Sequence, residues 1–267
     1  MSSEKKLSLP AEINLPHHIA IIPDGNRRWA HEHNLPPLEG HRRGAQVVIP
    51  LLRAARQWGI HTMTFWAFST ENWHRSSVEV KMLMALFEDS IDRHLAEAKK
   101  EGVRIYHLGR RDRLPQSLRK KIMQAEEETR QNTKHILNIA LDYGGHDEIL
   151  RAIGRFLDDL ARGKIRAEDL DEVIGEYEGK YPYYRFKNYL DTRDQPYPYP
   201  DLVIRTSGEL RTSGFLPWQS VYAEFYWEKV HFPDFTPEKL RAAIIDFSQR
   251  QRRFGGKKLN YAAASEN

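Results

Sequence analysis

The sequence contains no cysteine, which excludes disulfide bonds and thiolate metal sites and is compatible with a reducing compartment. It has no apolar run near the ~20 residues that a membrane-spanning helix requires, and residues 1–16 lack the apolar core of a signal peptide. Walker loops, Gly-x-Gly-x-x-Gly turns and His-Glu-x-x-His helices are absent too, so no motif favours a nucleotide hydrolase, a dinucleotide enzyme or a zinc protease. We therefore expect a soluble cytoplasmic protein with a short, loose leader.

The chain also lacks a strong excess of charge of one sign. Its 41 Lys and Arg residues against 37 Asp and Glu residues give a formal charge of +4. The basic residues are scattered singly and in pairs, and the densest group, residues 250–256, is short. A mild basic excess suits anionic ligands, whereas nucleic acid binding usually shows a concentrated basic stripe, so we expect no nucleic acid partner.

With 267 residues, 40% of them hydrophobic, the chain is long enough for one large domain. Short apolar runs alternate with stretches in which apolar residues recur with the helical period. The runs predict strands over 18–22, 61–68, 103–109, 135–141, 201–206 and 223–227, and the periodic stretches predict helices over 78–95, 147–160 and 237–254. This alternation predicts an α/β fold with a mainly parallel central sheet flanked by helices, in which ligands bind beyond the carboxyl ends of the strands.

The first strand ends in Pro-Asp-Gly-Asn-Arg-Arg-Trp, residues 23–29. Gly25 permits close approach of the backbone to a ligand, and the helix start that follows suits an anion together with Arg27 or Arg28. Asp24 conflicts with that site because a carboxylate repels an anion, and a divalent cation between the two removes the conflict. A helix cap paired with arginine explains Asp24 equally well from this stretch alone.

Two other strand ends carry chemistry that suits phosphate. After the second strand, one turn holds Ser69, Thr70, Glu71, Asn72, Trp73 and Arg75. Helix capping by the serines that follow does not explain the tryptophan and the arginine. After the fifth strand, Arg205 and Arg211 flank a turn rich in Gly and Ser that ends at Ser213, which suits a polyphosphate, although solvated arginines on a loop are the usual alternative. Because three strand ends agree, we favour a shared diphosphate.

Seven segments occur in the order HIAIIPDGNRRWA, GHRRG, AFSTENWHR, LNIALDYGG, DLVIRTSGELRTSGFLPWQ, YAEFYW and RRFGG. Together they resemble the cis-prenyltransferases, the family of undecaprenyl diphosphate synthase, over residues 17–256. The resemblance implies a catalytic domain over 17–256 between a leader (1–16) and a flexible tail (257–267). It also implies a homodimer with a hydrophobic tunnel beside the sheet. Such an enzyme condenses isopentenyl diphosphate onto an allylic diphosphate with the help of Mg²⁺, and each new double bond is cis.

The same resemblance implies roles for individual residues. Asp24 would be the magnesium carboxylate, and Glu224 would reach the metal within its own subunit or in the partner. The allylic diphosphate would be held by Gly25, Asn26, Arg27 and Arg28, with Trp29 and His41 beside it. The second substrate and its deprotonation would be ordered by Ser69, Thr70, Glu71, Asn72, Trp73 and Arg75. Asn72 is one proposed proton acceptor, but a neutral amide is a poor base, so a diphosphate oxygen or a relay is expected to take the proton. Isopentenyl diphosphate would be bound by Arg205, Arg211, Thr212 and Ser213. Arg253 and Gly255 would complete the site of the partner subunit.

One departure from the family pattern concerns the allylic site. Pro37 stands where the family commonly has an arginine, four residues before His41. The change removes a charge-assisted contact worth about 1.5–3 kcal/mol, for which Arg42 or Arg43 would have to compensate. An undecaprenyl-type synthase is expected. The alternatives are a short-chain or irregular synthase, or a non-catalytic partner subunit.

The helix over residues 79–96 is the candidate tunnel wall, with plain core packing as the alternative. A lipid product would also favour peripheral contact with a membrane during its release.

Overall fold

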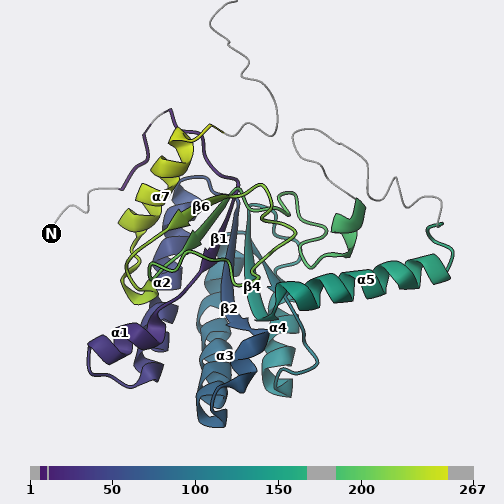
Figure 1. Cartoon of the computed structure of the whole chain (residues 1–267), viewed down its shortest axis with the longest axis horizontal. Coiled ribbons are helices and arrows are strands. Elements are labelled where there is room, and N and C mark those ends of the chain that lie inside the picture. The colour runs from purple at the N-terminus through teal and green to yellow at the C-terminus, as the bar shows by residue number, and fades with distance from the viewer. Residues whose placement is uncertain (1–6, 11, 167–184, 252–267) are drawn as a thin grey trace, which may run out of the picture.

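The computed structural model describes residues 7–10, 12–166 and 185–251 (Figure 1). The strands are β1 (His18–Ile22), β2 (Thr62–Ser69), β3 (Val103–Leu108), β4 (His135–Tyr143), β5 (Leu202–Arg205) and β6 (Glu224–Trp227). The helices are α1 (Asn26–Glu32), α2 (Pro37–Gln57), α3 (Ser77–Lys100), α4 (Gln116–Glu128), α5 (Gly145–Ala161) and α7 (Pro237–Gln249). Short 3₁₀ turns are η1 (Thr70–His74), η3 (Arg185–Tyr189) and η4 (Phe232–Asp234). All six predicted strands are confirmed to within two residues.

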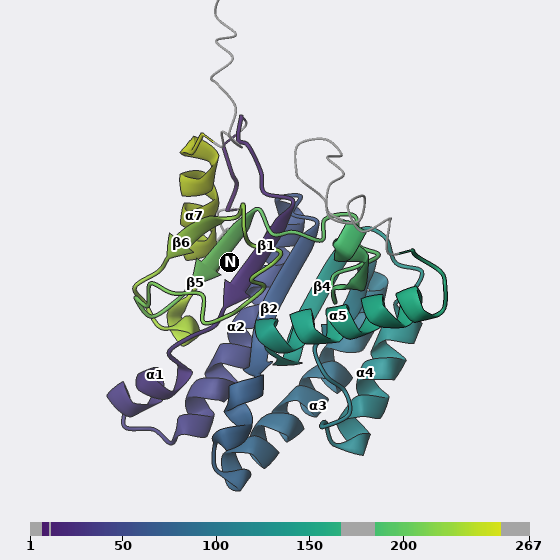
Figure 2. The same cartoon turned by 45° about the vertical axis from the view of Figure 1, so that its right-hand side comes forward.

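The strands form one parallel sheet in the order β3-β4-β2-β1-β5-β6 (Figure 2). The chain leaves β1 towards β2 on one side and leaves β5 towards β6 on the other. The paired ends of β1 and β5, where Ile22 lies opposite Arg205, are therefore the point at which the connections diverge. Open α/β sheets bind ligands at such a point, beyond the carboxyl ends of the strands.

Alternate residues of the central strands pack on opposite faces of the sheet, as the pleat requires. Ile19 and Ile21 of β1 join a core beneath α2 and α7, and the cavity described below places α3 and α4 on the same face. Ala20 and Ile22 face the other side, where Phe215 of the long β5–β6 connection and the β4–α5 junction cover them. Helices thus cover one face, and mainly loop covers the other.

Local sequence explains where several helices begin. The Ser76 hydroxyl accepts a hydrogen bond from the backbone N–H of Glu79 (3.3 Å) and caps α3. Pro37 and Pro237 occupy the first turns of α2 and α7, where a missing N–H costs nothing. The end of α7 is a correction, since the helix stops at Gln249 and Arg250 is extended, whereas periodicity predicts helix as far as residue 254.

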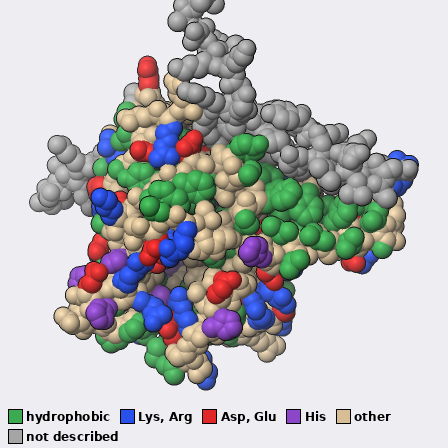
Figure 3. Space-filling model, viewed as in Figure 1, with side chains coloured by type: hydrophobic (Ala, Val, Ile, Leu, Met, Phe, Trp, Pro, Cys, Tyr) green, Lys and Arg blue, Asp and Glu red, His purple; other side chains and the backbone are tan. Residues whose placement is uncertain are grey.

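The helix predicted over residues 147–160 is confirmed as α5, but most of its apolar stripe faces solvent. Leu150, Ile153 and Leu157 are 69%, 40% and 54% exposed, and only the opposite side of the helix, with Ala152, is buried. The C-terminal half of α5 extends beyond the sheet (Figure 1), and hydrophobic side chains gather over this part of the surface (Figure 3). Among the described residues, no helix combines the length and apolar character needed to span a bilayer.

Candidate active site

Asp24 lies just beyond β1, between two arginines. Its Oδ1 accepts hydrogen bonds from Arg28 Nη2 (2.9 Å) and Gly25 N (2.7 Å), and its Oδ2 accepts one from Arg205 Nη2 (2.8 Å). Burial opposes ionisation of this carboxyl group, but the hydrogen bonds from Arg205 and Arg28 outweigh it and lower the pKa of Asp24. Of the alternative interpretation, a helix cap paired with arginine, the pairing with Arg28 is confirmed but the cap is wrong, because Gly25 is the N-cap of α1 and no side chain caps that helix.

The backbone of Asp24 is fixed by the loops that follow β5 and β6. Thr206 Oγ1 accepts from Asp24 N (2.9 Å) and donates to Asp24 O (2.8 Å), and Phe232 N donates to the same carbonyl (2.9 Å). Gly25 has a φ of 95°, and a Cβ there would lie 1.9 Å from Ser207 Oγ. Glycine is therefore required both by the backbone conformation and by the lack of space.

A pocket of about 590 Å³ opens beside this turn. Its lining comprises Pro23, Asp24, Gly25, Asn26, Arg27, Arg28, His31, Glu32, Pro37, His41 and Arg75. Charged and His side chains gather on this face around α1 (Figure 3). Arg27 forms no ion pair with any residue that the structure describes, whereas Arg75 pairs with Glu79 (3.1 Å). A pocket with an unpaired guanidinium and two further arginines suits an anionic ligand.

His41 is neutral at physiological pH in this setting. Burial, followed by the nearby positive charge of Arg75, lowers the pKa of His41 to about 4. Burial likewise lowers the pKa of Arg75, although Glu79 partly opposes the effect. A neutral imidazole can donate one hydrogen bond and accept another, which suits a phosphate oxygen or a polar side chain.

Several buried polar atoms near the turn have no hydrogen-bond partner within the described ranges. They include Asn26 Oδ1, Trp29 Nε1 and His41 Nε2. Leaving a buried polar atom unpaired costs about 1–3 kcal/mol, so the free hydrogen-bonding capacity of Asn26 and His41 favours a polar ligand in the pocket. Trp29 stacks on His33 and does not line the pocket.

The β5–β6 connection brings Arg205 and Ser213 to the same cluster. Arg205 Nη1 donates to Arg211 O (2.5 Å) and to Ser213 Oγ (2.9 Å), while Nη2 holds Asp24. The Arg211 side chain itself is largely exposed, and neither Arg211 nor Thr212 lines the pocket. The structure therefore links Arg205 and Ser213 to Asp24 through hydrogen bonds, although none of Arg205, Arg211, Thr212 and Ser213 lines this pocket.

Glu209 in this loop was not predicted from the sequence. Its carboxylate pairs with Arg28 (2.9 Å) and with Arg211. Two guanidinium groups assigned to different diphosphates thus share one acidic partner across the two strand ends. The only sequence signal is the position of Glu209 between Arg205 and Arg211.

The turn after β2 uses part of its polar chemistry for its own structure. The Ser69 side chain accepts a hydrogen bond from the backbone of Asn72, and Asn72 Oδ1 accepts one from Ser69 N (3.1 Å). Thr70 Oγ1 donates to Glu71 (2.9 Å), and a Cβ at Gly144 would lie 2.4 Å from the same oxygen. Of the six residues singled out in this turn, only Arg75 lines the pocket.

Trp73 points towards β4 and away from the pocket. Its Nε1 donates to Oδ1 of the fully buried Asp142 (2.9 Å), which also binds the Arg113 guanidinium through both oxygens. Arg113 lies 5.9 Å from the Trp73 ring centroid. Asp142 and Arg113, which the sequence did not predict either, therefore fix the turn from the side away from the pocket.

Glu224 does not reach Asp24 within one chain. It begins β6 opposite Leu202, three positions (about 10 Å) before the strand end that contributes to the site, and it pairs with Arg250 (3.0 Å). The predicted partner contacts Arg253 and Gly255 lie outside the described residues.

The donor set around Asp24 fits magnesium bound together with phosphate. Among the described residues, no group of three or more His, Asp or Glu side chains is placed to hold a metal ion. Mg²⁺ typically keeps several waters and is bound by one or two carboxylates together with substrate phosphates. A single protein carboxylate beside a pocket for a phosphate therefore fits this ion.

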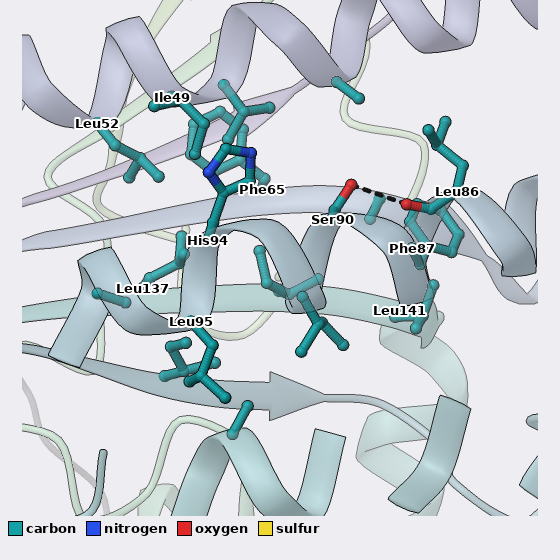
Figure 4. A pocket seen from close by; sticks show the side chains of 18 of the residues that line it. Ile49, Leu52, Phe65, Leu86, Phe87, Ser90, His94, Leu95, Leu137 and Leu141 are labelled. Carbon is teal, nitrogen blue, oxygen red and sulfur yellow. Dashed lines mark hydrogen bonds between the residues drawn. The ribbon is translucent and has the colours of Figure 1, made fainter. Parts of the chain in front are cut away.

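An apolar cavity of about 230 Å³ shares Pro23, Asn26 and His41 with the polar pocket. It extends between α2, α3 and the sheet, and its walls include Ile49, Leu52, Phe65, Leu86, Phe87, Ile91, Leu95, Leu137 and Leu141 (Figure 4). Ser90 also lines it, but its hydroxyl donates to the Leu86 carbonyl (2.8 Å) and is thereby satisfied. The cavity therefore suits a hydrocarbon chain.

Charged side chains line the part of the cavity near the C-terminal ends of α2 and α3. Glu97 of α3 approaches Arg56 of α2 (3.6 Å) and pairs with Arg53 (2.8 Å). Both Arg56 and Glu97 line the cavity. Arg56 lies about 22 Å along α2 from His41. An apolar chain that entered beside His41 would meet this ion pair.

The fold and site together define an α/β protein for ligands with an anionic head and an apolar tail. The family model described as "Putative undecaprenyl diphosphate synthase" matches residues 22–255. The chain belongs to this family, the cis-prenyltransferases.

Relatives and solved structures agree with that membership. An isoprenyl transferase from Bacillus anthracis is 44% identical over 91% of this chain and 89% of its own length, and one from Clostridium perfringens is 42% identical over 92% of each. Lavandulyl diphosphate synthase from Lavandula x intermedia, solved with dimethylallyl diphosphate, matches with a TM-score of 0.83 at 33% identity over 90% of this chain and 98% of its own. A probable undecaprenyl diphosphate synthase from Campylobacter jejuni matches with a TM-score of 0.70 at 29% identity over 91% and 100%.

Proposed function

We propose that this protein is a cis-prenyltransferase that condenses isopentenyl diphosphate with an allylic diphosphate to give a cis-polyprenyl diphosphate. The observation that carries the proposal is the junction of an arginine-lined pocket with an apolar cavity at Pro23, Asn26 and His41. An allylic diphosphate has the matching form, because it joins an anionic head to a hydrocarbon tail. The isoprenyl transferase relatives and the lavandulyl diphosphate synthase solved with dimethylallyl diphosphate support the same ligand class.

Ionisation of the allylic substrate leaves negative charge on the diphosphate and positive charge on carbon. Arg27 and Arg28 are placed to bind the diphosphate and to stabilise that negative charge as it develops. Asn26 and His41, with unpaired buried atoms between the two cavities, would hydrogen-bond the head where the tail begins. Arg205, Ser213, Arg211 and Thr212 would hold the isopentenyl diphosphate beside it.

Magnesium is the proposed cofactor, held by Asp24 and substrate phosphates, with the partner's Glu224 as a second carboxylate. When bound, the ion neutralises charge on the leaving diphosphate. Asp24 contributes an ionised carboxylate whose position is set by Arg28 and Arg205. A bound diphosphate would be a second anion, besides Asp24, with which Arg28 and Arg205 could pair.

The proton lost after bond formation is assigned to a diphosphate oxygen or a relay rather than to Asn72. The Asn72 side-chain oxygen already accepts from Ser69 N, and a neutral amide is a weak base. Asn72 and Ser69 therefore act by shaping the turn, and Arg75 carries the charge of that turn into the pocket.

The apolar cavity would receive the growing chain and exclude water from the cationic carbon. Leu86, Phe87 and Ile91 of α3 line it, whereas Met84 is packed in the core and Met82 is exposed. We propose an undecaprenyl-type product, in which the chain extends from His41 towards Glu97.

A short-chain or irregular synthase is the second candidate, favoured by Pro37. This proline lines the pocket and offers neither charge nor N–H, while Arg42 pairs with Glu39 and neither Arg42 nor Arg43 lines the pocket. No described arginine of α2 therefore replaces the family contact. The similarity to lavandulyl diphosphate synthase agrees with this candidate.

The exposed stripe of α5 supports a homodimer. Leu150, Ile153 and Leu157 form an apolar surface on a helix that extends beyond the sheet, and Val221 and Tyr222 of the β5–β6 connection are exposed as well. A second copy of the chain would bury this surface, since exposed apolar side chains gathered on one face often mark an interface.

We further propose that the enzyme is cytoplasmic and contacts the membrane peripherally when the lipid product leaves. Val78 and Met82 are exposed on the first turns of α3. Their neighbour Glu79 has its Oε1 3.6 Å from Nε2 of His41, the residue that lines both cavities. These side chains are placed to meet lipid close to the active site.

The direct test is incubation of the purified protein with isopentenyl diphosphate, Mg²⁺ and allylic primers of several lengths, followed by measurement of product masses. Successive additions of five-carbon units support the proposal, and a long limiting product supports the undecaprenyl type. A single condensation supports the second candidate. Failure to form product from any primer leaves only the non-catalytic subunit and refutes the proposed reaction.

A further inference from the structure

Three side chains next to the Asp24 turn form a continuous hydrogen-bonded chain that has no role in the reaction described above. Ser207 Oγ lies 2.5 Å from His231 Nδ1, and His231 Nε2 lies 2.9 Å from Glu32 Oε1. The three residues come from the loop after β5, the loop after β6 and the last position of α1. They therefore connect three segments that meet at the active site.

The chemistry of the three groups fixes the direction of the hydrogen bonds. An ionised carboxylate only accepts, so His231 Nε2 carries the proton that Glu32 receives. In the neutral ring Nδ1 is then an acceptor, and the Ser207 hydroxyl donates to it. Pairing of a histidine with a carboxylate is the usual way in which one tautomer is selected.

The hydrogen-bonded chain of Ser207, His231 and Glu32, here named the relay, packs directly on Gly25. A Cβ at Gly25 would lie 1.9 Å from Ser207 Oγ and 2.4 Å from His231 Nδ1, so both atoms occupy the space that a side chain there would need. The next residue, Phe232, donates its N–H to Asp24 O, and Ser207 N donates to Val230 O (2.8 Å). The relay thus contacts the turn whose carboxylate lies between Arg28 and Arg205.

The backbone at Ser207 is held in a conformation that serine rarely adopts. Its φ is 76°, in the left-handed region, and it is neither glycine nor asparagine. Residues persist in this region when surrounding contacts determine their position, and such positions occur most often at functional sites.

A serine, a histidine and an acid in line also describe a nucleophilic triad, but the surroundings disfavour that interpretation. A nucleophilic serine needs free backbone N–H groups to stabilise an oxyanion. Here Ser207 N donates to Val230 O and Gly208 N donates to Glu228 O (2.8 Å), so both nearby donors are occupied.

We propose that Ser207, His231 and Glu32 are positioning residues that hold the Asp24–Gly25 turn and α1 in place for the allylic diphosphate. The identity of the ligand in this inference rests on the proposed function, whereas the geometry of the three residues does not depend on it. Loss of the relay would let α1 move relative to the β5 loop, and affinity for the allylic substrate would fall while affinity for isopentenyl diphosphate stayed nearly unchanged.

Glu32→Ala is the main test, because Glu32 is exposed and its removal does not open the core. We expect Kd for a non-hydrolysable allylic thiodiphosphate, measured by calorimetry with Mg²⁺, to rise about 5- to 30-fold. KM for isopentenyl diphosphate is expected to change less than twofold. Glu32→Gln keeps an acceptor oxygen for His231 Nε2 and is expected to restore most of the affinity. Glu127→Ala, which removes a similarly exposed carboxylate from α4, is the matched control and is expected to bind normally.

The serine is tested by two variants that differ in backbone freedom. Ser207→Ala and Ser207→Gly both remove the hydroxyl, but only glycine accepts the left-handed conformation without strain. Equal losses of affinity in the two variants assign the effect to the hydroxyl. Wild-type affinity in Ser207→Gly would overturn the role of the hydroxyl.

A spectroscopic measurement tests the relay without any turnover. In ¹⁵N-histidine NMR above the ordinary histidine pKa, His231 is expected as the Nε2–H tautomer, and Glu32→Ala is expected to shift it towards a mixture. Absence of this tautomer in the wild type, or equal Kd values for wild type and Glu32→Ala, would refute the relay. A covalent fluorophosphonate adduct on Ser207 would replace the positioning role by the nucleophilic one. Failure of the wild type to form product would instead refute the proposed function, which is a separate outcome.

Discussion

Replacement of Asp24 by Asn removes the carboxylate between Arg28 and Arg205 and changes almost nothing in shape. Arg205 has a side chain that is only 6% exposed, and it would keep Arg211 O and Ser213 Oγ as acceptors but lose its ionic partner. Loss of a hydrogen bond to a charged group costs about 1.5–3 kcal/mol. For a domain of this size that corresponds to a fall in Tm of about 3–12 °C, so the variant is expected to stay folded at 25 °C.

The effect of Asp24→Asn on turnover is expected to be much larger than its effect on folding. The variant loses the carboxylate proposed for magnesium, leaves Arg205 without its ionic partner, and leaves Arg28 paired with Glu209 alone. Loss of such electrostatic stabilisation lowers kcat by about 10²–10³-fold or more. Asp24→Ala is expected to abolish turnover in a protein that remains folded.

The assay for Asp24→Asn is incorporation of labelled isopentenyl diphosphate, with circular dichroism and thermal unfolding on the same samples. Asp89→Asn is the matched control, because it breaks an ion pair with Arg93 on the exposed side of α3, outside both cavities. Near-normal turnover in a folded Asp24→Asn variant would show that the assignment of the catalytic carboxylate is wrong.

Three further predictions concern pH, product length and assembly. Burial lowers the pKa of His18, His41 and His107 to about 4, below the ordinary 6.5. The unfolded chain therefore binds more protons than the folded one, and the free energy of unfolding should fall as pH drops from about 6.5 to 4. Urea titrations at several pH values check this, and a free energy of unfolding that does not change with pH would contradict it. Leu95→Trp fills the apolar cavity beyond its middle and should shorten the limiting product by mass spectrometry, whereas an unchanged mass distribution would remove the cavity from chain-length control. Leu157→Asp places a charge on the exposed stripe of α5 and should convert a dimer to a folded monomer in sedimentation velocity; an unchanged dimer would place the interface elsewhere.

The strands were predictable because a parallel sheet covered on both faces needs nearly continuous apolar runs, such as residues 18–22. Their order places the chemistry after β1 and β5 together, and there Arg205 binds Asp24, a contact that the sequence did not predict. The helical period of α5 was also correct, but periodicity shows only that a face is apolar and not what covers it. For this reason the exposure of Leu150 and Leu157 could not be predicted.

Partners that come from distant segments were not predictable from the sequence. Asp142 binds Trp73 across 69 positions, and Glu209 pairs with Arg28 across 181, so no local pattern indicates either contact. The reciprocal hydrogen bonds of Ser69 and Asn72 are local and could have been predicted, because a serine followed three residues later by an amide is typical of a capping box.

The geometry of the newly formed double bond tests the central claim most directly. The purified protein, given ¹³C-labelled isopentenyl diphosphate, Mg²⁺ and an allylic primer, is predicted to form a product whose labelled double bonds are cis by NMR. Labelled trans double bonds, or recovery of both substrates unchanged with every primer, would contradict the account.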